Sequence, residues 1–471
     1  MVAEVDKIER HILGEAWTTD ETYRNLIQLC DDIGHRFGGS PSEQKAAEFL
    51  LEKMRSYGLH NVHLEEFPVY TWERGSCNLT VTSPSTREIT AICMPYNGTT
   101  TVEGKLINVG GGEKEDYERL GDVVRGNVVL TDAETETRSH RTDKYRWAHE
   151  AGASAVIFLN RNPGLLHITG ALYAKNPGGP NDEDHEAPIP GIGITYESGE
   201  LLRRLMDRGD VTVRIQTENK TRLSHSYNVV GDIPGSDLAN EILLFGGHYD
   251  GHDIAQGAAD DGAGTLVGLE TGRLLAPFAG ELKRTVRIIC FGCEEIGLIG
   301  SWAHADSYHV ADADEQLRFA MNLDGAGRGE GGKERISVTK DDSWGEYFKQ
   351  MADDLHYNFE VLDRMSVHSD HFPFFLAGYP SATLQSQDAT AGMIGRGYGH
   401  TEADTVDKVT LRGMQMGAAF AARVATRLAN ADDLPDGMRS QDEVKTVLED
   451  EELGHVLEHH WGRDNRPATT A

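Results

Sequence analysis

The sequence is poor in the features that would place a protein in a membrane or outside the cell. No uninterrupted run of about 18 apolar residues occurs among its 471 residues, so no membrane-spanning helix is expected. The first residues lack the basic segment and apolar core of a secretory signal peptide. Only five cysteines are present, an odd and sparse set that argues against a disulfide framework and favours a reducing compartment. These absences predict a soluble, cytoplasmic protein.

Positive charge is also scarce. The 76 Asp and Glu residues far outnumber the 45 Lys and Arg residues, and the formal net charge is −31. Such a surface repels the phosphates of nucleic acids and anionic lipids, so neither a nucleic-acid nor a membrane partner is expected. Dense carboxylates with little lysine indicate a halophilic protein, which remains soluble where salt screens its self-repulsion. An ordinary acidic cytosolic enzyme is the alternative that composition leaves open.

The pattern of apolar residues changes twice along the chain. Apolar residues at helical spacing over 42–57 predict a helix, and partial alternation of apolar and polar residues over 60–70 predicts a strand. These elements indicate the first part of a larger domain. Between about 104 and 220, short β-like runs, the last at 211–215, are separated by glycine, proline and charged residues and predict a small β-rich or mixed α/β domain. From a strand at 227–231 onwards, strands alternate with helices, which predicts a mostly parallel, twisted sheet with helices on both faces.

The C-terminal tail is polar and acidic. It is expected to form one helix, over 440–459, and then to fray. The chain is thus expected to fold as an α/β domain interrupted by a small insert. The expected divisions are residues 1–100, 101–222, 223–430 and 431–471.

Histidine and carboxylate residues follow the expected strands of the α/β domain, at the point where each strand ends. In an open parallel sheet, ligands bind beyond the carboxyl ends of the strands. Strands expected at 241–246, 285–291 and 318–323 each lead into such residues, and a glycine-rich loop after a fourth strand ends in another histidine. One rim of the sheet is therefore predicted to gather His248, Asp250, Asp260, Glu294, Glu295, Asp324 and His400.

These side chains suit a pair of divalent metal ions. Imidazole and carboxylate ligands without thiolates fit zinc, although another divalent metal is an alternative. A carboxylate can bridge two ions, which lower the pKa of a water towards ~7 and polarise a scissile carbonyl. A further carboxylate that is not a ligand must then move the proton. Each piece alone has a plainer explanation as a helix cap or a charged helix start, but five pieces at successive strand ends favour a metal centre.

Seven motifs resemble those of the zinc aminopeptidase and plasma glutamate carboxypeptidase family, metallopeptidase family 28. They cover the span from about residue 225 to 410, and GHRFGGS (34–40) resembles the family's N-terminal entry segment. The seven are YNVVG (227–231), GGHYD (246–250), GAADDGAGT (257–265), CEEIGLIGS (293–301), NLDGAG (322–327), HSDHFPFFLAGYPSA (368–382) and GHTEADTVDKV (399–409).

Residues 105–220 resemble the protease-associated domain that several members of this family carry. The resemblance lies in the runs GNVVL (126–130), GASAVI (152–157) and IPGIGI (189–194). It implies a domain that covers the cleft or serves assembly, with a small independent binding module as the alternative.

The resemblance also implies a ligand set. His248, Asp260 and Asp324 would bind one zinc ion. Asp260, Glu295 and His400 would bind the other, so that Asp260 bridges the pair.

Three further residues of the motifs take roles from the resemblance. Glu294 would be the general base and later the acid. Asp250 would orient the imidazole of His248. The peptide bond between Asp260 and Asp261 is expected to be cis, as the family typically holds it.

Contacts with substrate are less defined. Many relatives have a tyrosine directly before the last histidine; here Gly399 takes that place, and Tyr398 either substitutes for it or only packs. Asp370 and His371 are candidates for substrate contact, with a hydrogen-bonded structural role as the alternative. His252 is expected on an exposed loop.

These observations predict a di-zinc exopeptidase acting on peptides, with an aminopeptidase as the first reading and a dipeptidase or carboxypeptidase of the same family as alternatives. A glutaminyl cyclase-like acyltransferase and a non-catalytic receptor-type relative are further alternatives, which the complete ligand set disfavours. The phosphate-binding pattern G-x-x-x-x-G-K-[ST] is missing, which disfavours a nucleotide-binding enzyme. Homo-oligomerisation stays open.

Overall fold

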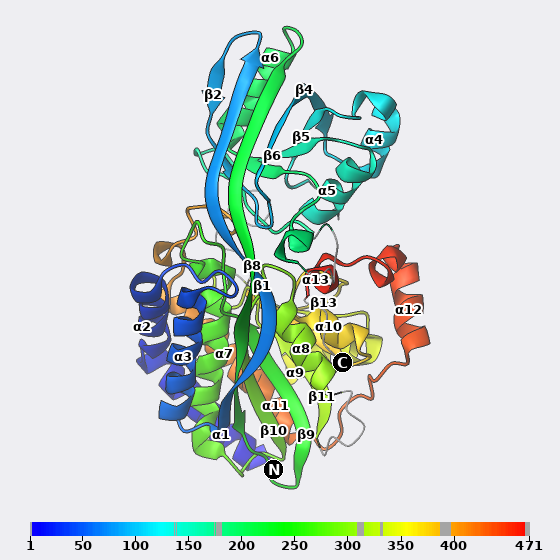
Figure 1. Cartoon of the computed structure of the whole chain (residues 1–471). Helices are drawn as coiled ribbons and strands as arrows, with labels where there is room; N and C mark the ends of the chain where they lie inside the picture. The colour runs from blue at the N-terminus through cyan, green and yellow to red at the C-terminus, as the bar shows by residue number, and fades with distance from the viewer. Residues whose placement is uncertain are drawn as a thin grey trace.

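The computed structural model describes residues 2–135, 137, 139–173, 175, 181–308, 315–329, 333–386 and 397–466. It has two lobes, and two long strands, β1 (His60–Ser83) and β8 (Thr212–Ile233), run side by side from one lobe into the other (Figure 1). Within these ranges, no helix is both long and apolar enough to cross a membrane.

β1 and β8 form an antiparallel ribbon along most of their length, from His60 opposite Asp232 to Ser83 opposite Thr212. The strands expected at 211–215 and 227–231 are therefore parts of one strand, and the expectation of a break between them is wrong. The polar residues between them stay extended because their backbone groups pair with β1, which needs no continuous hydrophobic pattern. β8 thus crosses the division expected at residue 222.

The larger lobe is built on a mixed sheet with a parallel centre. β14, β11, β9 and β10 run parallel to one another, whereas β12 is antiparallel to β14 and β8 is antiparallel to β10. This confirms the expected α/β class, although the two strands at one edge, 334–338 and 360–363, were not predicted. In order across the sheet the strands are β13 (Glu360–Asp363), β12 (Glu334–Val338), β14 (Ser381–Ser386), β11 (Gln316–Asn322), β9 (Leu238–His248), β10 (Arg284–Phe291) and β8.

Alternate side chains of this sheet face two helical layers. On β9, Leu243 and Phe245 belong to one apolar cluster, and Ile242 and Leu244 belong to another, as expected for a strand buried on both faces. The second cluster includes residues of α8 (Ile299–Ser307) and α10 (His371–Leu376). The first includes residues of α1 (Val2–Thr18), α2 (Glu21–Ile27), α3 (Pro41–Ser56), α7 (Ala263–Leu275), α9 (Asp342–Leu355) and α11 (Leu411–Asn430).

The smaller lobe is a separate α/β unit, which bears out the expected insert. Its sheet continues from β8 in the order β4, β5, β6, β7 and β3, and a short strand, β2 (Arg87–Ile89), pairs with β1. Two apolar clusters lie on its faces, one with Leu202 of α6 and one with Tyr145 of α5. Its elements are β3 (Ala91–Cys93), β4 (Thr100–Gly110), α4 (Lys114–Leu120), β5 (Val128–Asp132), α5 (Arg141–Glu150), β6 (Ala155–Leu159), β7 (Gly191–Ile194) and α6 (Tyr196–Met206).

The C-terminal segment folds back over the larger lobe, beneath the smaller one (Figure 1). It contains α12 (Gln441–Asp450) and α13 (Trp461–Asp464), and Val444 and Leu448 pack against the aromatic residues of α10. Asn465 Nδ2 donates to the carbonyl oxygens of Leu172 and Ile296 at 3.1 and 3.2 Å. The expectation that the chain frays after residue 459 is wrong as far as residue 466, because His460 Nε2 lies 2.8 Å from the carbonyl oxygen of Val367 and Asn465 makes the two hydrogen bonds just given.

Candidate active site

The structure brings the five predicted metal ligands to one rim of the larger sheet. β9, β10 and β11 are parallel neighbours, so their carboxyl ends lie next to one another. β9 ends at His248, the loop after β10 carries Glu294 and Glu295, and Asp324 follows β11. His400 reaches the rim from a loop ahead of α11, and part of the glycine-rich stretch before it, residues 387–396, lies outside the described residues.

Asp260 lies between the two histidines. Its Oδ1 is 3.5 Å from His248 Nε2, and its Oδ2 is 3.5 Å from His400 Nε2. Glu295 Oε2 lies 3.1 Å from the same nitrogen of His400. Ligand atoms on a tetrahedral zinc ion, with bonds of about 2.0–2.1 Å, stand ~3.3 Å apart, so these separations fit two ions that share Asp260.

Arg328, which was not predicted from the sequence, lies beside two of these ligands, Asp260 and Asp324. Its Nη2 donates to Asp260 Oδ1 at 3.1 Å and to Asp324 Oδ1 at 3.0 Å. Ser369 Oγ donates to the second oxygen of Asp324 at 2.7 Å. The guanidinium charge offsets the repulsion between the two carboxylates. The sequence could not have identified Arg328, because its position four residues after an aspartate does not distinguish it from a surface arginine.

Asp250 ties the loop after β9 to the loop after β10. Its Oδ1 accepts the backbone N–H of Glu294 at 2.9 Å, and its Oδ2 accepts that of Glu295 at 3.2 Å. The same Oδ1 lies 3.5 Å from His248 Nδ1, so Asp250 also faces the imidazole that the family resemblance implies it orients. The carboxylate is fully buried. It therefore fixes three members of the site at once.

The turn that carries Asp260 is held from the far side by Asp404. The carboxylate of Asp404 accepts the backbone N–H groups of Ala259 and Asp260 at 2.7 and 3.1 Å. The peptide bond between Asp260 and Asp261 is cis, which confirms the prediction made from the motif. Asp261 points inward and accepts the N–H of Gly325 at 3.0 Å, so its place is structural.

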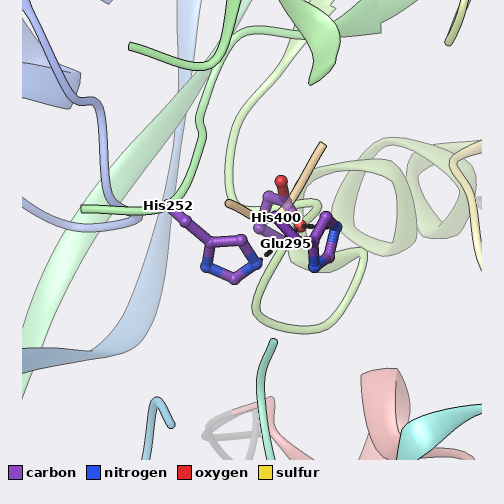
Figure 2. A group of neighbouring side chains, drawn as sticks. All are labelled: His252, Glu295 and His400. Atoms are coloured by element: carbon purple, nitrogen blue, oxygen red, sulfur yellow. Dashed lines mark ion pairs between the residues drawn. The ribbon is translucent and has the colours of Figure 1, made fainter. Parts of the chain in front are cut away.

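His252 is a member of the site that the sequence reading missed. The expectation of an exposed loop residue is wrong, because its side chain is only 3% exposed and its Nε2 lies 3.1 Å from Glu295 Oε2. Figure 2 shows its ring on the opposite side of Glu295 from His400. The loop turns inward where Arg74 pairs with Asp253 at 2.6 Å. The feature of the sequence that could have identified His252 is its position two residues after Asp250, in the loop that follows the ligand His248.

The two adjacent glutamates differ in their tendency to hold a proton. Burial raises the pKa of Glu294 well above its ordinary value, and the attraction of His248 offsets this only in part. Burial acts in the same direction on Glu295, but His252 and His400 outweigh it and hold the pKa of Glu295 well below its ordinary range. Glu295 is thus suited to bind a cation as an anion, and Glu294 is suited to accept and hold a proton.

The smaller lobe supplies part of the wall around this site. A small cavity is lined by Glu294, Glu295, His400 and His368 from the larger lobe and by His140, Arg141 and Ala171 from the smaller one. Arg141 Nη2 lies 2.8 Å from His400 Nδ1, and the rings of His140 and His368 stack with centroids 4.1 Å apart. A larger cavity of about 390 Å³ adjoins it at His368 and is lined by α5 and the C-terminal segment.

The three residues expected to contact substrate lie outside the walls of both cavities. Asp370 and His371 are buried at the start of α10. Tyr398 is half-buried, and the ammonium group of Lys408 lies 5.1 Å from its ring centre. Their neighbour His368 does line both cavities.

Sequence comparison finds known families over most of the chain. Residues 228–425 match Peptidase family M28, and residues 102–202 match the PA domain. Carboxypeptidase Q of Mus musculus is 25% identical over 426 residues, which cover 88% of this chain and 87% of that one. Carboxypeptidase Q of Rattus norvegicus is 28% identical over a match that spans 60% of each chain. Aminopeptidase YwaD of Bacillus subtilis is 26% identical over 91% of this chain and 89% of its own.

Solved structures share the fold over nearly the whole chain. A Peptidase M28 precursor from Shewanella amazonensis SB2B superposes with a TM-score of 0.77 at 22% identity, over 93% of this chain and all of that one. BSAP, a zinc aminopeptidase from Bacillus subtilis, superposes with a TM-score of 0.65 at 23% identity, over 89% of this chain and 97% of its own. Both lobes are therefore shared with known two-lobed structures.

Proposed function

Because the chain belongs to peptidase family M28 and carries a PA domain, it is a metallopeptidase, and we propose that it is a two-zinc exopeptidase that releases N-terminal residues from peptides. One observation carries the proposal: the two oxygens of Asp260 face His248 and His400 from opposite sides, both at 3.5 Å. A carboxylate with one imidazole beside each of its oxygens can bridge a pair of ions, each held by one of the imidazoles.

The donor set fits zinc. His248, Asp260 and Asp324 would hold one ion, and Asp260, Glu295 and His400 would hold the other. The donors are imidazole nitrogens and carboxylate oxygens, without a thiolate among them. Bound zinc would lower the pKa of a water and polarise the scissile carbonyl.

Glu294 is the proposed proton carrier. It stands outside this ligand set, lines the small cavity and is buried, so its carboxyl group has a raised pKa. As a general base it would take the proton of the attacking water, and as a general acid it would pass that proton to the leaving amine. Asp250 would keep Glu294 in place through the backbone hydrogen bond at 2.9 Å.

The inserted lobe is proposed to cover the catalytic cleft. It would span about residues 101–222, between the catalytic parts at 1–100 and 223–430, and the segment from 431 would close the larger cavity from the other side. Support comes from Arg141 and His140, which reach the cavity wall beside His400 and His368. A cleft covered in this way favours small peptides and chain ends over folded proteins.

The choice of chain end is the finer part of the proposal. A dipeptidase or carboxypeptidase is the main alternative, since relatives bear both kinds of name. An acyltransferase of the glutaminyl cyclase type would need one ion, and two facing imidazoles on one carboxylate favour two. A receptor-type relative would not need the proton carrier.

A substrate panel with and without metal tests the proposal. Peptides with a free amine, N-blocked dipeptides and C-amidated peptides would be offered to the purified protein, to the chelated protein and to the chelated protein given zinc back. Cleavage of free-amine and C-amidated peptides only, lost on chelation and restored by zinc, is expected. Cleavage of N-blocked peptides would assign a carboxypeptidase. Undiminished cleavage after the metal has demonstrably left would overturn the metal mechanism.

A further inference from the structure

His252 is a buried imidazole directed at the proposed metal site. It lies on the loop between β9 and Asp260, and its side chain is buried. Its ring centre is 4.5 Å from that of His400, and the two rings are inclined by 70°. Both rings therefore meet at Glu295, one from each side (Figure 2).

The nitrogens of His252 are not accounted for by hydrogen bonds. Neither Nδ1 nor Nε2 has a hydrogen-bond partner among the residues that the structure describes. Nε2 is 3.1 Å from Glu295 Oε2, which is close enough, but the geometry is not that of a hydrogen bond. A nitrogen and an oxygen placed so close without pointing at each other are expected when both point at an ion between them.

The loop holds His252 in this position through contacts of its other residues. Arg74 pairs with Asp253, with Nη2 to Oδ1 at 2.6 Å and Nε to Oδ2 at 2.7 Å. Arg36, which is fully buried, donates to the carbonyl oxygens of Tyr249 and Gly257 at the two ends of the loop, at 2.5 and 2.8 Å. The imidazole is thus placed before any ligand arrives, as a preorganised metal site requires.

We propose that His252 is a further protein ligand of the zinc ion held by Asp260, Glu295 and His400. This inference rests on the proposed two-zinc function. Four protein ligands complete a tetrahedral zinc sphere, whereas three leave a position open. The ion beside His252 is therefore the closed, tightly held one, and the ion beside His248 and Asp324 keeps the open position.

Stepwise metal release tests this assignment without reference to turnover. Wild type, His252→Ala and the control His60→Ala, which removes an exposed histidine at the start of β1, would be loaded with zinc and dialysed against rising chelator, with zinc per chain measured. Wild type and the control are expected to lose one equivalent early and one late. In His252→Ala the late equivalent is expected to leave at a chelator strength at least about 100-fold lower, beyond what loss of a mere supporting contact gives.

Cobalt substitution separates a ligand from a supporting residue. The visible spectrum of the cobalt protein reports the number and kind of ligands, so His252→Ala is expected to change it. His252→Cys, which offers a thiolate instead, is expected to restore tight binding and add a thiolate-to-metal band. An unchanged spectrum and unchanged release in a folded His252→Ala protein would overturn the ligand role while leaving the two-zinc function intact. Release of a single equivalent by wild type would overturn the two-zinc function itself.

Discussion

Asp250 accepts the backbone N–H of Glu294 at 2.9 Å, and with its second oxygen it accepts that of the next residue, Glu295. One carboxylate thereby sets the position of both the proposed proton carrier and a proposed metal ligand, while it also faces the imidazole of His248. The catalytic loops are thus fixed to each other through a single buried side chain.

Asp250→Asn is expected to loosen this arrangement. An amide keeps one acceptor oxygen but turns an NH₂ group towards the backbone N–H of Glu294 or Glu295, so one hydrogen bond is lost and two donors face each other. Zinc affinity should fall by about 10–100-fold, as it does when other supporting contacts of metal ligands are removed. Zinc content against chelator measures this, with the exposed Asp237→Asn as the control. Wild-type affinity in Asp250→Asn would show that the contact is dispensable.

Glu294→Gln tests the proton carrier. The substitution keeps the shape of the side chain but cannot accept a proton, so kcat is expected to fall by about 10²–10⁴-fold while two zinc ions stay bound. Steady-state kinetics together with metal analysis checks both parts. Near-normal turnover would remove Glu294 from the mechanism, and loss of zinc would make it a ligand instead.

Arg328→Met tests the charge balance of the ligand set. Removal of the guanidinium leaves the carboxylates of Asp260 and Asp324 buried without their partner, at a cost of about 3 kcal/mol in the metal-free protein. With zinc bound, the ions themselves offset the carboxylates, so the loss should be smaller. Urea unfolding with and without zinc measures the difference. Arg335→Met, which breaks a more exposed pair with Glu360, is the control, and equal losses in both metal states would contradict the prediction.

Arg141→Met tests whether the inserted lobe takes part in the site. Arg141 lies 2.8 Å from His400 and lines the small cavity, so its loss should misplace the substrate and lower kcat/KM by about 100-fold while zinc content is kept. Arg119→Met, an exposed arginine of the same lobe, should leave kcat/KM unchanged. Equal behaviour of the two variants would assign the lobe a role away from the reaction.

Salt dependence tests the halophilic reading of the composition. With a net charge of −31, the carboxylates of the folded chain repel one another and destabilise it. Salt screens this repulsion, because the Debye length falls from about 10 Å at 0.1 M salt to about 3 Å at 1 M. The melting temperature is therefore expected to rise steeply over this range. A melting temperature that does not depend on salt would favour the ordinary acidic enzyme.

The sequence allowed the α/β fold and the place of the metal site to be predicted because both depend on regular signals. Buried strands are marked by continuous apolar runs. Since parallel strands present their carboxyl ends at one rim of the sheet, His248, Glu295 and Asp324 could be predicted to lie close together. The cis bond after Asp260 was expected only from the resemblance of its motif to a known family.

The residues that the sequence did not disclose depend on non-local contacts. His252 and Arg328 are single polar residues in polar loops, and only the folded chain turns them inward. The middle of β8 is held extended by its partner strand rather than by its own side chains. The contact of Arg141 with His400 joins residues 259 positions apart, which no periodic pattern can reveal.

The most direct test of the central claim is the anomalous scattering of zinc in crystals of the zinc-loaded protein. Two anomalous peaks about 3.5–4 Å apart are expected, one on either side of Asp260. One should lie among His248 and Asp324, and the other among Glu295, His400 and His252. A single peak, or peaks away from Asp260, would contradict it.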